Sequence, residues 1–187
     1  DKTKVLVLSH VTCTTGMILP VKKIANYCKK KGIISCIDGA QAVGMIPVNI
    51  TDINPDFYVT SGHKWLFGSK GTGILYINEY FLKNNSPHYV GAYSDSAFNL
   101  GTKTFEYLDT ASREEYGTRN LPIIAGLGSA IDFISEVGME KISLRGQQLA
   151  EKFRDGISTH PRITILTPEK ENGSGSIITF KIQSKDN

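Results

Sequence analysis

The sequence lacks the features of a membrane-spanning, disulfide-stabilised or nucleic-acid-binding protein. No apolar run approaches the roughly 18 residues that a membrane span needs, and we expect no signal peptide. Its three cysteines show no C-x-x-C spacing, so they favour a reducing compartment over a disulfide framework or a metal site. The net charge is +3, and the basic run Lys29–Lys31 is typical of a solvated helix end. We therefore expect a cytoplasmic protein with no metal, no membrane partner and no nucleic-acid partner.

What the chain does contain is a globular composition with α/β patterning. Of its 187 residues, 40% are hydrophobic and 21% are charged, as in ordinary globular proteins. A short continuous apolar run at residues 5–8 predicts a buried parallel strand, and further strands are predicted at residues 33–38, 57–60 and 73–77. A helix is predicted after Pro20, because apolar residues recur with helical spacing from Val21 to Cys28 and Gly32 follows. This alternation predicts a mostly parallel sheet covered by helices.

The second half of the chain is less regular. Residues 79–119 show no periodicity, and a stretch of that length without it is often functional. Helical periodicity returns from Pro122 and again after Gly138. Two strand candidates follow, at residues 163–166 and 177–182.

These patterns predict two structural units. Residues 1–137 would form part of a large α/β domain, and residues 138–187 the beginning of a smaller C-terminal domain. Both ends look cut from a longer protein, because the chain starts with Asp1 directly before a predicted strand and stops just after another.

Three polar residues near the ends of predicted strands suit an aromatic aldehyde cofactor. Asp38 ends one strand, Gln41 lies three residues later, and Lys64 comes just after the next strand. Ligands of open parallel sheets bind outside the carboxyl ends of the strands, so these residues and the loop His10–Thr15 should meet at one edge. A lysine can hold pyridoxal phosphate (PLP) as a Schiff base, while a carboxylate keeps the ring nitrogen protonated.

Neighbouring side chains add matching chemistry. Ser61 and His63 offer donors for phosphate oxygens, and Gln41 can donate to the phenolic oxygen of the ring. Lys64, once displaced by a substrate, can act as a general base. The glycines of Gly68–Gly73 lead into a strand rather than a helix, which favours a tight turn over dinucleotide binding.

Three ordered motifs resemble the class V aminotransferase family of fold type I PLP enzymes. They are Ser9–Gly16 with Pro20 after it, Asp38–Gly44, and Ser61–Lys64 with Gly71–Gly73. A fourth stretch, Tyr116–Asn120, resembles another family motif, and the match extends more loosely to about residue 180. The resemblance implies an α/β fold with a mostly parallel sheet, the second half of the large domain, plus the start of a small α+β C-terminal domain.

The resemblance also implies roles for the motif residues. It assigns Lys64 to the Schiff base, Asp38 to the pyridinium nitrogen and Gln41 to the ring oxygen. Ser61 and His63 would bind the phosphate.

Further residues are implied at the margins of the site. Cys13 would line the cofactor site. Thr118 would reach the phosphate of a neighbouring subunit, which implies a homodimer with shared active sites. Arg119 is a candidate clamp for the carboxylate of a small amino-acid substrate, with surface or intersubunit pairing as the alternative.

We expect a PLP-dependent enzyme that acts at Cα of a small amino acid, by transamination or epimerase-like chemistry. Many desulfurase-like members of the family carry Asn where this chain has Cys13, and the runs His63–Trp65 and Gly117–Arg119 favour the epimerase-like branch. One alternative is a cysteine desulfurase or lyase of the same family. Another is a non-catalytic fragment that needs the family's N-terminal half, which supplies a residue stacking on the cofactor. A nicotinamide-binding oxidoreductase is disfavoured, because the chain has no glycine-rich strand-to-helix turn.

Overall fold

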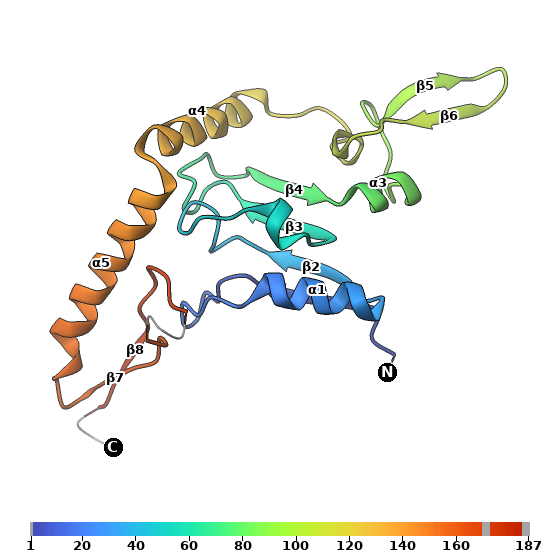
Figure 1. Ribbon diagram of the computed structural model, residues 1–187. Helices are drawn as coiled ribbons and strands as arrows, with labels where there is room; N and C mark the ends of the chain where they lie inside the picture. Colours follow the sequence, from blue (N-terminus) through green and yellow to red (C-terminus); the bar gives the residue numbers. More distant parts are fainter. Residues whose placement is uncertain (1, 170–172, 185–187) are drawn as a thin grey trace.

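A four-stranded sheet forms the centre of the structure, a computed structural model that describes residues 2–169 and 173–184. In sheet order the strands are β1 (Val5–Ser9), β2 (Ile34–Asp38), β3 (Phe57–Ser61) and β4 (Gly73–Ile77). The first three are parallel, and β4 runs antiparallel to β3 because the loop between them is shorter than a parallel crossover, which takes about a dozen or more residues. The prediction of a mostly parallel sheet is confirmed (Figure 1).

Two helices, α1 (Val21–Lys31) and α2 (Ile50–Ile53), cover one face of this sheet (Figure 1). The core beneath α1 includes Ile37 and Tyr58, both almost fully buried. α1 ends at Gly32, whose φ of 63° gives the left-handed C-cap that glycine adopts without steric cost. The sequence-based prediction of this helix and of its stop is therefore confirmed.

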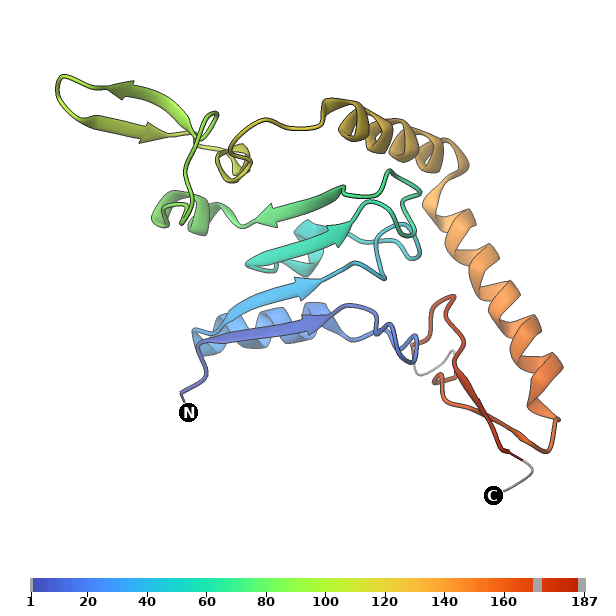
Figure 2. The same ribbon diagram turned by 180° about the vertical axis from the view of Figure 1, so that it is seen from behind.

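The opposite face of the sheet is open in the part of the chain that the structure describes (Figure 2). Val5 and Val7 of β1 are 50% and 68% exposed, and Leu75 of β4 is 43% exposed. Parallel sheets normally carry a covering layer on both faces. The described residues thus supply this sheet with one of two layers.

Residues 79–119 contain more regular structure than their sequence indicates. They form α3 (Glu79–Asn84), a hairpin of β5 (Asp95–Asn99) and β6 (Thr104–Tyr107), and the 3₁₀ turn η1 (Ala111–Glu114). α3 buries none of its residues, and the hairpin projects away from the sheet with Phe98 and Phe105 exposed (Figure 1). Because neither α3 nor the hairpin has a fully buried residue, no apolar periodicity marks them in the sequence.

The C-terminal part begins with two long helices, α4 (Leu121–Val137) and α5 (Met139–Ser158), which are separated by Gly138 and bent by 79°. No single helix among the described residues is long and apolar enough to cross a membrane; only this bent pair, taken together, passes a test of length and composition. A short antiparallel ladder of β7 (Ile163–Ile165) and β8 (Phe180–Ile182) follows.

The strand predicted at 177–182 is half as long in the structure. The backbone N–H groups of Leu166 and Thr167 both donate to the carbonyl of Thr179, and the Thr179 N–H donates to the Thr167 hydroxyl. The bond from the Thr179 N–H to the Thr167 hydroxyl takes the place of a backbone–backbone bond of the β7–β8 ladder, so β8 does not extend to residue 179. The predicted division of the chain at residue 137 stays a prediction.

Candidate active site

The carboxyl ends of β1, β2 and β3 meet at one edge of the sheet. Parallel pairing places Asp38 opposite Ser9 on one side and Val59 on the other. Beyond these pairs, the backbone N–H of His10 donates to the Asp38 carbonyl over 2.8 Å, and that of Gly39 donates to the Val59 carbonyl over 2.7 Å. The loops that carry the predicted site residues therefore start from neighbouring points, as the strand-end argument requires.

The Asp38 carboxylate is held by the turn that follows it. Its Oδ1 accepts a hydrogen bond of 2.8 Å from the backbone N–H of Ala40. Its Oδ2 has no hydrogen-bond partner within residues 2–169 and 173–184. One oxygen is thus fixed by the protein, while the other is available to an outside donor.

Lys64 lies in a compact loop between β3 and β4. The Gly62 N–H donates to the Thr72 carbonyl, the Gly68 N–H to the Gly62 carbonyl, and the Phe67 N–H to the Lys64 carbonyl. A side chain at Gly62 would come within 2.2 Å of the Thr72 hydroxyl, so this close approach requires glycine. Lys64 is half-buried, and its amine makes no ion pair or hydrogen bond with the described residues.

Gln41 is joined to the loop of Lys64 through Trp65. The indole Nε1–H donates to Gln41 Oε1 over 2.8 Å. Because indole N–H is a donor only, the carboxamide must turn its oxygen to Trp65, which leaves its NH₂ group as a donor. Sequence reasoning did not assign Trp65 to the site; its place next to Lys64 was the one available signal.

The two loops also touch through their backbones. Gly44 has a φ of 90°, and a Cβ there would lie 2.4 Å from the Trp65 carbonyl oxygen. Only glycine permits both this dihedral and this contact. The turn after Asp38 and the loop of Lys64 are thereby fixed to one another.

Of the two predicted phosphate ligands, Ser61 is the last residue of β3 and His63 lies in the loop that follows. Ser61 is half-buried and His63 is exposed. Neither side chain has a hydrogen-bond partner in the part of the chain that the structure describes. Their donors are thus available to an anion at the same edge as Asp38 and Lys64.

Cys13 is exposed in the loop that follows β1. This loop is closed by a 2.7 Å bond between the hydroxyls of Thr12 and Thr15 and by a bond from the Gly16 N–H to the Thr12 carbonyl. The C-terminal segment supports it, because the Gly175 N–H donates to the Gly16 carbonyl. The structure records no hydrogen bond from Cys13 to Asp38, Gln41 or Lys64 among the described residues.

Thr118 and Arg119 lie in the connection between η1 and α4. Thr118 is exposed. Arg119 forms an ion pair with Glu115, and its guanidinium lies 5.2 Å from the centre of the Tyr93 ring. Within the described residues no hydrogen bond or ion pair connects either residue to Asp38, Gln41 or Lys64.

A buried pair that sequence reasoning missed lies next to the Asp38 turn. His10 Nδ1 and the Tyr58 hydroxyl are 2.9 Å apart, and both residues are less than one-tenth exposed. Burial lowers the pKa of His10 from 6.5 to about 4, so its imidazole is neutral at physiological pH. Burial, and then the negative charge of Asp38, raise the pKa of the Tyr58 hydroxyl above its ordinary value.

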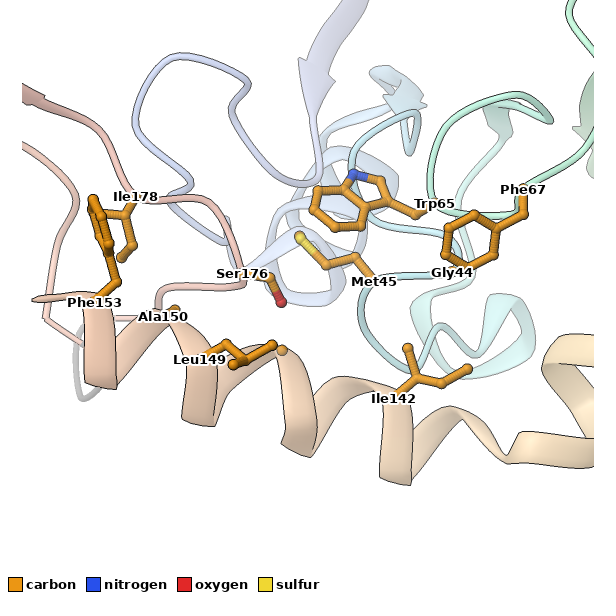
Figure 3. A pocket seen from close by; sticks show the side chains of 11 residues that line it. Gly44, Met45, Trp65, Phe67, Ile142, Leu149, Ala150, Phe153, Ser176 and Ile178 are labelled. Carbon is orange, nitrogen blue, oxygen red and sulfur yellow. The ribbon is translucent and has the colours of Figure 1, made fainter.

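An apolar cavity of about 470 Å³ lies between α5 and the Lys64 loop (Figure 3). Trp65, Met45 and Phe67 line one side, and Leu149 and other α5 residues line the other. In Figure 3 the indole nitrogen of Trp65 lies on the side of the ring away from α5. Trp65 therefore contributes its ring to the cavity and its N–H to Gln41.

Comparisons with known proteins agree with this arrangement. The family profile described as "Aminotransferase class-V" matches residues 1–187, and the chain belongs to that family. A probable cysteine desulfurase of Halalkalibacterium halodurans is 33% identical over 186 residues, which are 98% of this chain and 44% of that protein. The chain thus spans less than half the length of the curated relatives it matches.

Solved structures show the same fold. The apo cysteine desulfurase of Thermococcus onnurineus NA1 superposes with a TM-score of 0.86 at 26% identity, covering 96% of this chain and 44% of that one. C-DES, described as a cystine C-S lyase in complex with its product cysteine persulfide, gives 0.86 at 26% identity, covering 98% and 49%. A lysine-to-alanine variant of C-DES, with glycine covalently linked to PLP, gives 0.87. The α/β fold is that of fold type I PLP enzymes, as expected from the sequence.

The comparisons favour a different branch of the family from the one we expected. The named relatives are cysteine desulfurases, and they support the desulfurase or lyase alternative better than transamination or epimerisation. The earlier preference depended on Cys13 and two short runs, which are few positions against a match over 186 residues.

Proposed function

We propose that this chain supplies half of a PLP-dependent active site that cleaves the carbon–sulfur bond of cysteine or cystine. The observation that carries the proposal is the convergence of Asp38 and Lys64 on one sheet edge, each with an unengaged polar group among the described residues. The similarity to cysteine desulfurases and to a cystine lyase supports the choice of substrate. Because the chain spans less than half of these relatives, the activity is proposed for the full-length protein.

The donor set fits the cofactor chemically. Lys64 would hold the aldehyde carbon covalently, and Asp38 Oδ2 would accept from the ring N–H. Gln41, oriented by Trp65, would donate to the ring oxygen, and Ser61 and His63 would donate to the phosphate. When bound, PLP supplies an electron sink for charge that develops at the substrate Cα.

The first test is covalent capture at Lys64. The full-length protein is incubated with PLP and reduced with borohydride, and the labelled peptide is identified by mass spectrometry. We expect the label on Lys64, none in the Lys64→Ala variant, and an unchanged label in Lys70→Ala, an exposed lysine of the same loop. Label on another residue in the wild-type protein would contradict the proposed site.

The second test concerns the reaction. A panel of amino acids is assayed in parallel for sulfide or persulfide, keto acid and racemised product. We expect sulfur release from cysteine or cystine to dominate, with loss of release in Lys64→Ala. Dominant keto-acid formation without sulfur release would restore transamination as the better proposal.

We also propose that Thr118 acts across a homodimer. Its exposure, and the absence of any hydrogen bond to its own Asp38 or Lys64 within the described residues, support a role at a neighbour's phosphate. Mixing inactive Lys64→Ala subunits with impaired Thr118→Val subunits should restore up to about a quarter of the wild-type sites, because half of the dimers are hybrids with one intact site each. Activity no greater than the sum of the separate variants would contradict sharing.

A further inference from the structure

The turn that follows Asp38 packs against the buried side chain of Tyr58. Gly39 follows Asp38, and a Cβ at Gly39 would lie 2.1 Å from Cε1 of Tyr58 and 2.3 Å from its hydroxyl oxygen. The phenol ring therefore packs directly against the backbone of the turn. A contact this close limits how the backbone of the turn can move relative to Tyr58. It also requires glycine at position 39.

His10 fastens the same turn at two points. Its backbone N–H donates to the Asp38 carbonyl over 2.8 Å, and its Nδ1 is 2.9 Å from the Tyr58 hydroxyl. The rings of His10 and Tyr58 meet edge to face, with centroids 6.0 Å apart. Both side chains are buried, and Tyr58 belongs to the core cluster around Ile37, so its ring cannot move without disturbing that core.

The remaining bonds of the turn complete a closed arrangement. The Gly39 carbonyl accepts from the N–H groups of Ala42 and Val43 and from the Thr60 hydroxyl. The Ala40 N–H, the group that holds Asp38 Oδ1, lies between these anchored positions. The orientation of the carboxylate thus depends on how firmly Gly39 is held.

We infer that His10 and Tyr58 form a positioning pair, which holds the Gly39–Ala40 backbone so that Asp38 keeps one oxygen on the Ala40 N–H and offers the other to a ring nitrogen. The inference rests on the proposed function, since it concerns the carboxylate that would meet the PLP ring. Neither residue touches the reacting atoms in this role; they act through the backbone of the turn. Loss of the Tyr58 hydroxyl should loosen the turn while the ring still fills its place under Gly39.

The first test needs no cofactor. Hydrogen exchange of the Ala40 amide is measured by NMR in the absence of PLP for the wild type, Tyr58→Phe and Tyr76→Phe. Tyr76 is the matched control, because it pairs with Tyr58 across β3 and β4, on the same face, and its hydroxyl makes no hydrogen bond with the described residues. We expect Ala40 exchange to rise about tenfold in Tyr58→Phe and to stay unchanged in Tyr76→Phe.

The second test reads cofactor affinity. PLP is titrated into the full-length protein, and binding is followed by the absorbance of the bound cofactor. We expect the Kd for PLP to rise about tenfold in Tyr58→Phe and His10→Ala, and to return toward the wild-type value in His10→Gln, whose amide can still bond the phenol. Urea unfolding of each apo variant separates these effects from global instability.

The outcomes distinguish a failure of the positioning role of His10 and Tyr58 from a failure of the proposed PLP site. Unchanged Ala40 exchange and unchanged Kd in Tyr58→Phe would overturn the pair's role. If Tyr58→Phe does not fold, the comparison of His10→Ala with His10→Gln decides instead, and equal exchange rates and Kd values in the two would overturn it. A wild-type protein that binds no PLP would overturn the proposed function, whatever the exchange data show.

Discussion

Trp65 donates its indole N–H to the carboxamide oxygen of Gln41 over 2.8 Å, across 24 positions of sequence. The bond joins the loop of Lys64 to the turn of Asp38, and the close approach of Gly44 to the Trp65 carbonyl joins the same two segments through their backbones. The proposed covalent anchor and the proposed carboxylate partner are therefore held in one rigid unit. A cofactor that binds through several separate contacts requires such preorganisation.

Trp65→Phe should weaken PLP binding without unfolding the protein. Phenylalanine keeps a ring in the cavity beside α5 but cannot donate to Gln41, so the carboxamide loses its fixed orientation. We expect the Kd for PLP, measured from the absorbance of the bound cofactor, to rise roughly 5- to 10-fold, the worth of one hydrogen bond. Phe67→Leu, which changes the same cavity without touching Gln41, is the control. Equal losses in both variants would attribute the effect to the cavity alone.

Gly44→Ala should destabilise the fold far more than Gly32→Ala. Both glycines have positive φ, 90° and 63°, so both substitutions carry the cost of a left-handed backbone, about 1 kcal/mol. At Gly44 the new Cβ would also lie 2.4 Å from the Trp65 carbonyl oxygen, whereas at Gly32 nothing lies within 4 Å. We expect urea unfolding to show a loss of more than about 2 kcal/mol for Gly44→Ala. A similar loss in both variants would mean that the loop of Lys64 shifts without cost.

The sequence predicted the parts of this site that follow from strand ends and failed for the parts that follow from long-range packing. Asp38, Gln41 and Lys64 could be placed together because carboxyl ends of parallel strands share one edge. The contact of Trp65 with Gln41 and that of His10 with Tyr58 join positions 24 and 48 residues apart, and no local pattern encodes either. The β5–β6 hairpin was missed for a different reason, since it has no buried face to impose alternation on its sequence.

The stability of the protein should fall between pH 6.5 and pH 4 in a way that depends on His10. Burial lowers the pKa of His10 to about 4 in the folded protein, against 6.5 for an exposed histidine. In this window the unfolded chain binds a proton that the folded chain does not, so the free energy of unfolding decreases as the pH falls. The contribution is up to roughly 3 kcal/mol. It should appear as the difference between wild type and His10→Gln in urea unfolding across the window; parallel curves would refute it.

Asp38→Asn separates the charge of Asp38 from its structural bond. Asparagine keeps an oxygen that accepts from the Ala40 N–H, so the turn should persist, and the free energy of unfolding should change by less than about 1 kcal/mol. Affinity for PLP should fall more than in Tyr58→Phe, because the partner of the ring nitrogen itself is lost.

Asp38→Asn also tests, in the absence of PLP, whether the charge of Asp38 acts on the neighbouring Cys36 thiol. Burial and then the charge of Asp38 raise the pKa of the Cys36 thiol. Removing that charge in Asp38→Asn should therefore lower the pKa of Cys36. Alkylation of Cys36, followed over pH by peptide mass spectrometry, should therefore begin at lower pH in Asp38→Asn, with exposed Cys13 as the internal reference for reagent reactivity. An unchanged Cys36 profile would contradict an influence of the Asp38 charge on this thiol.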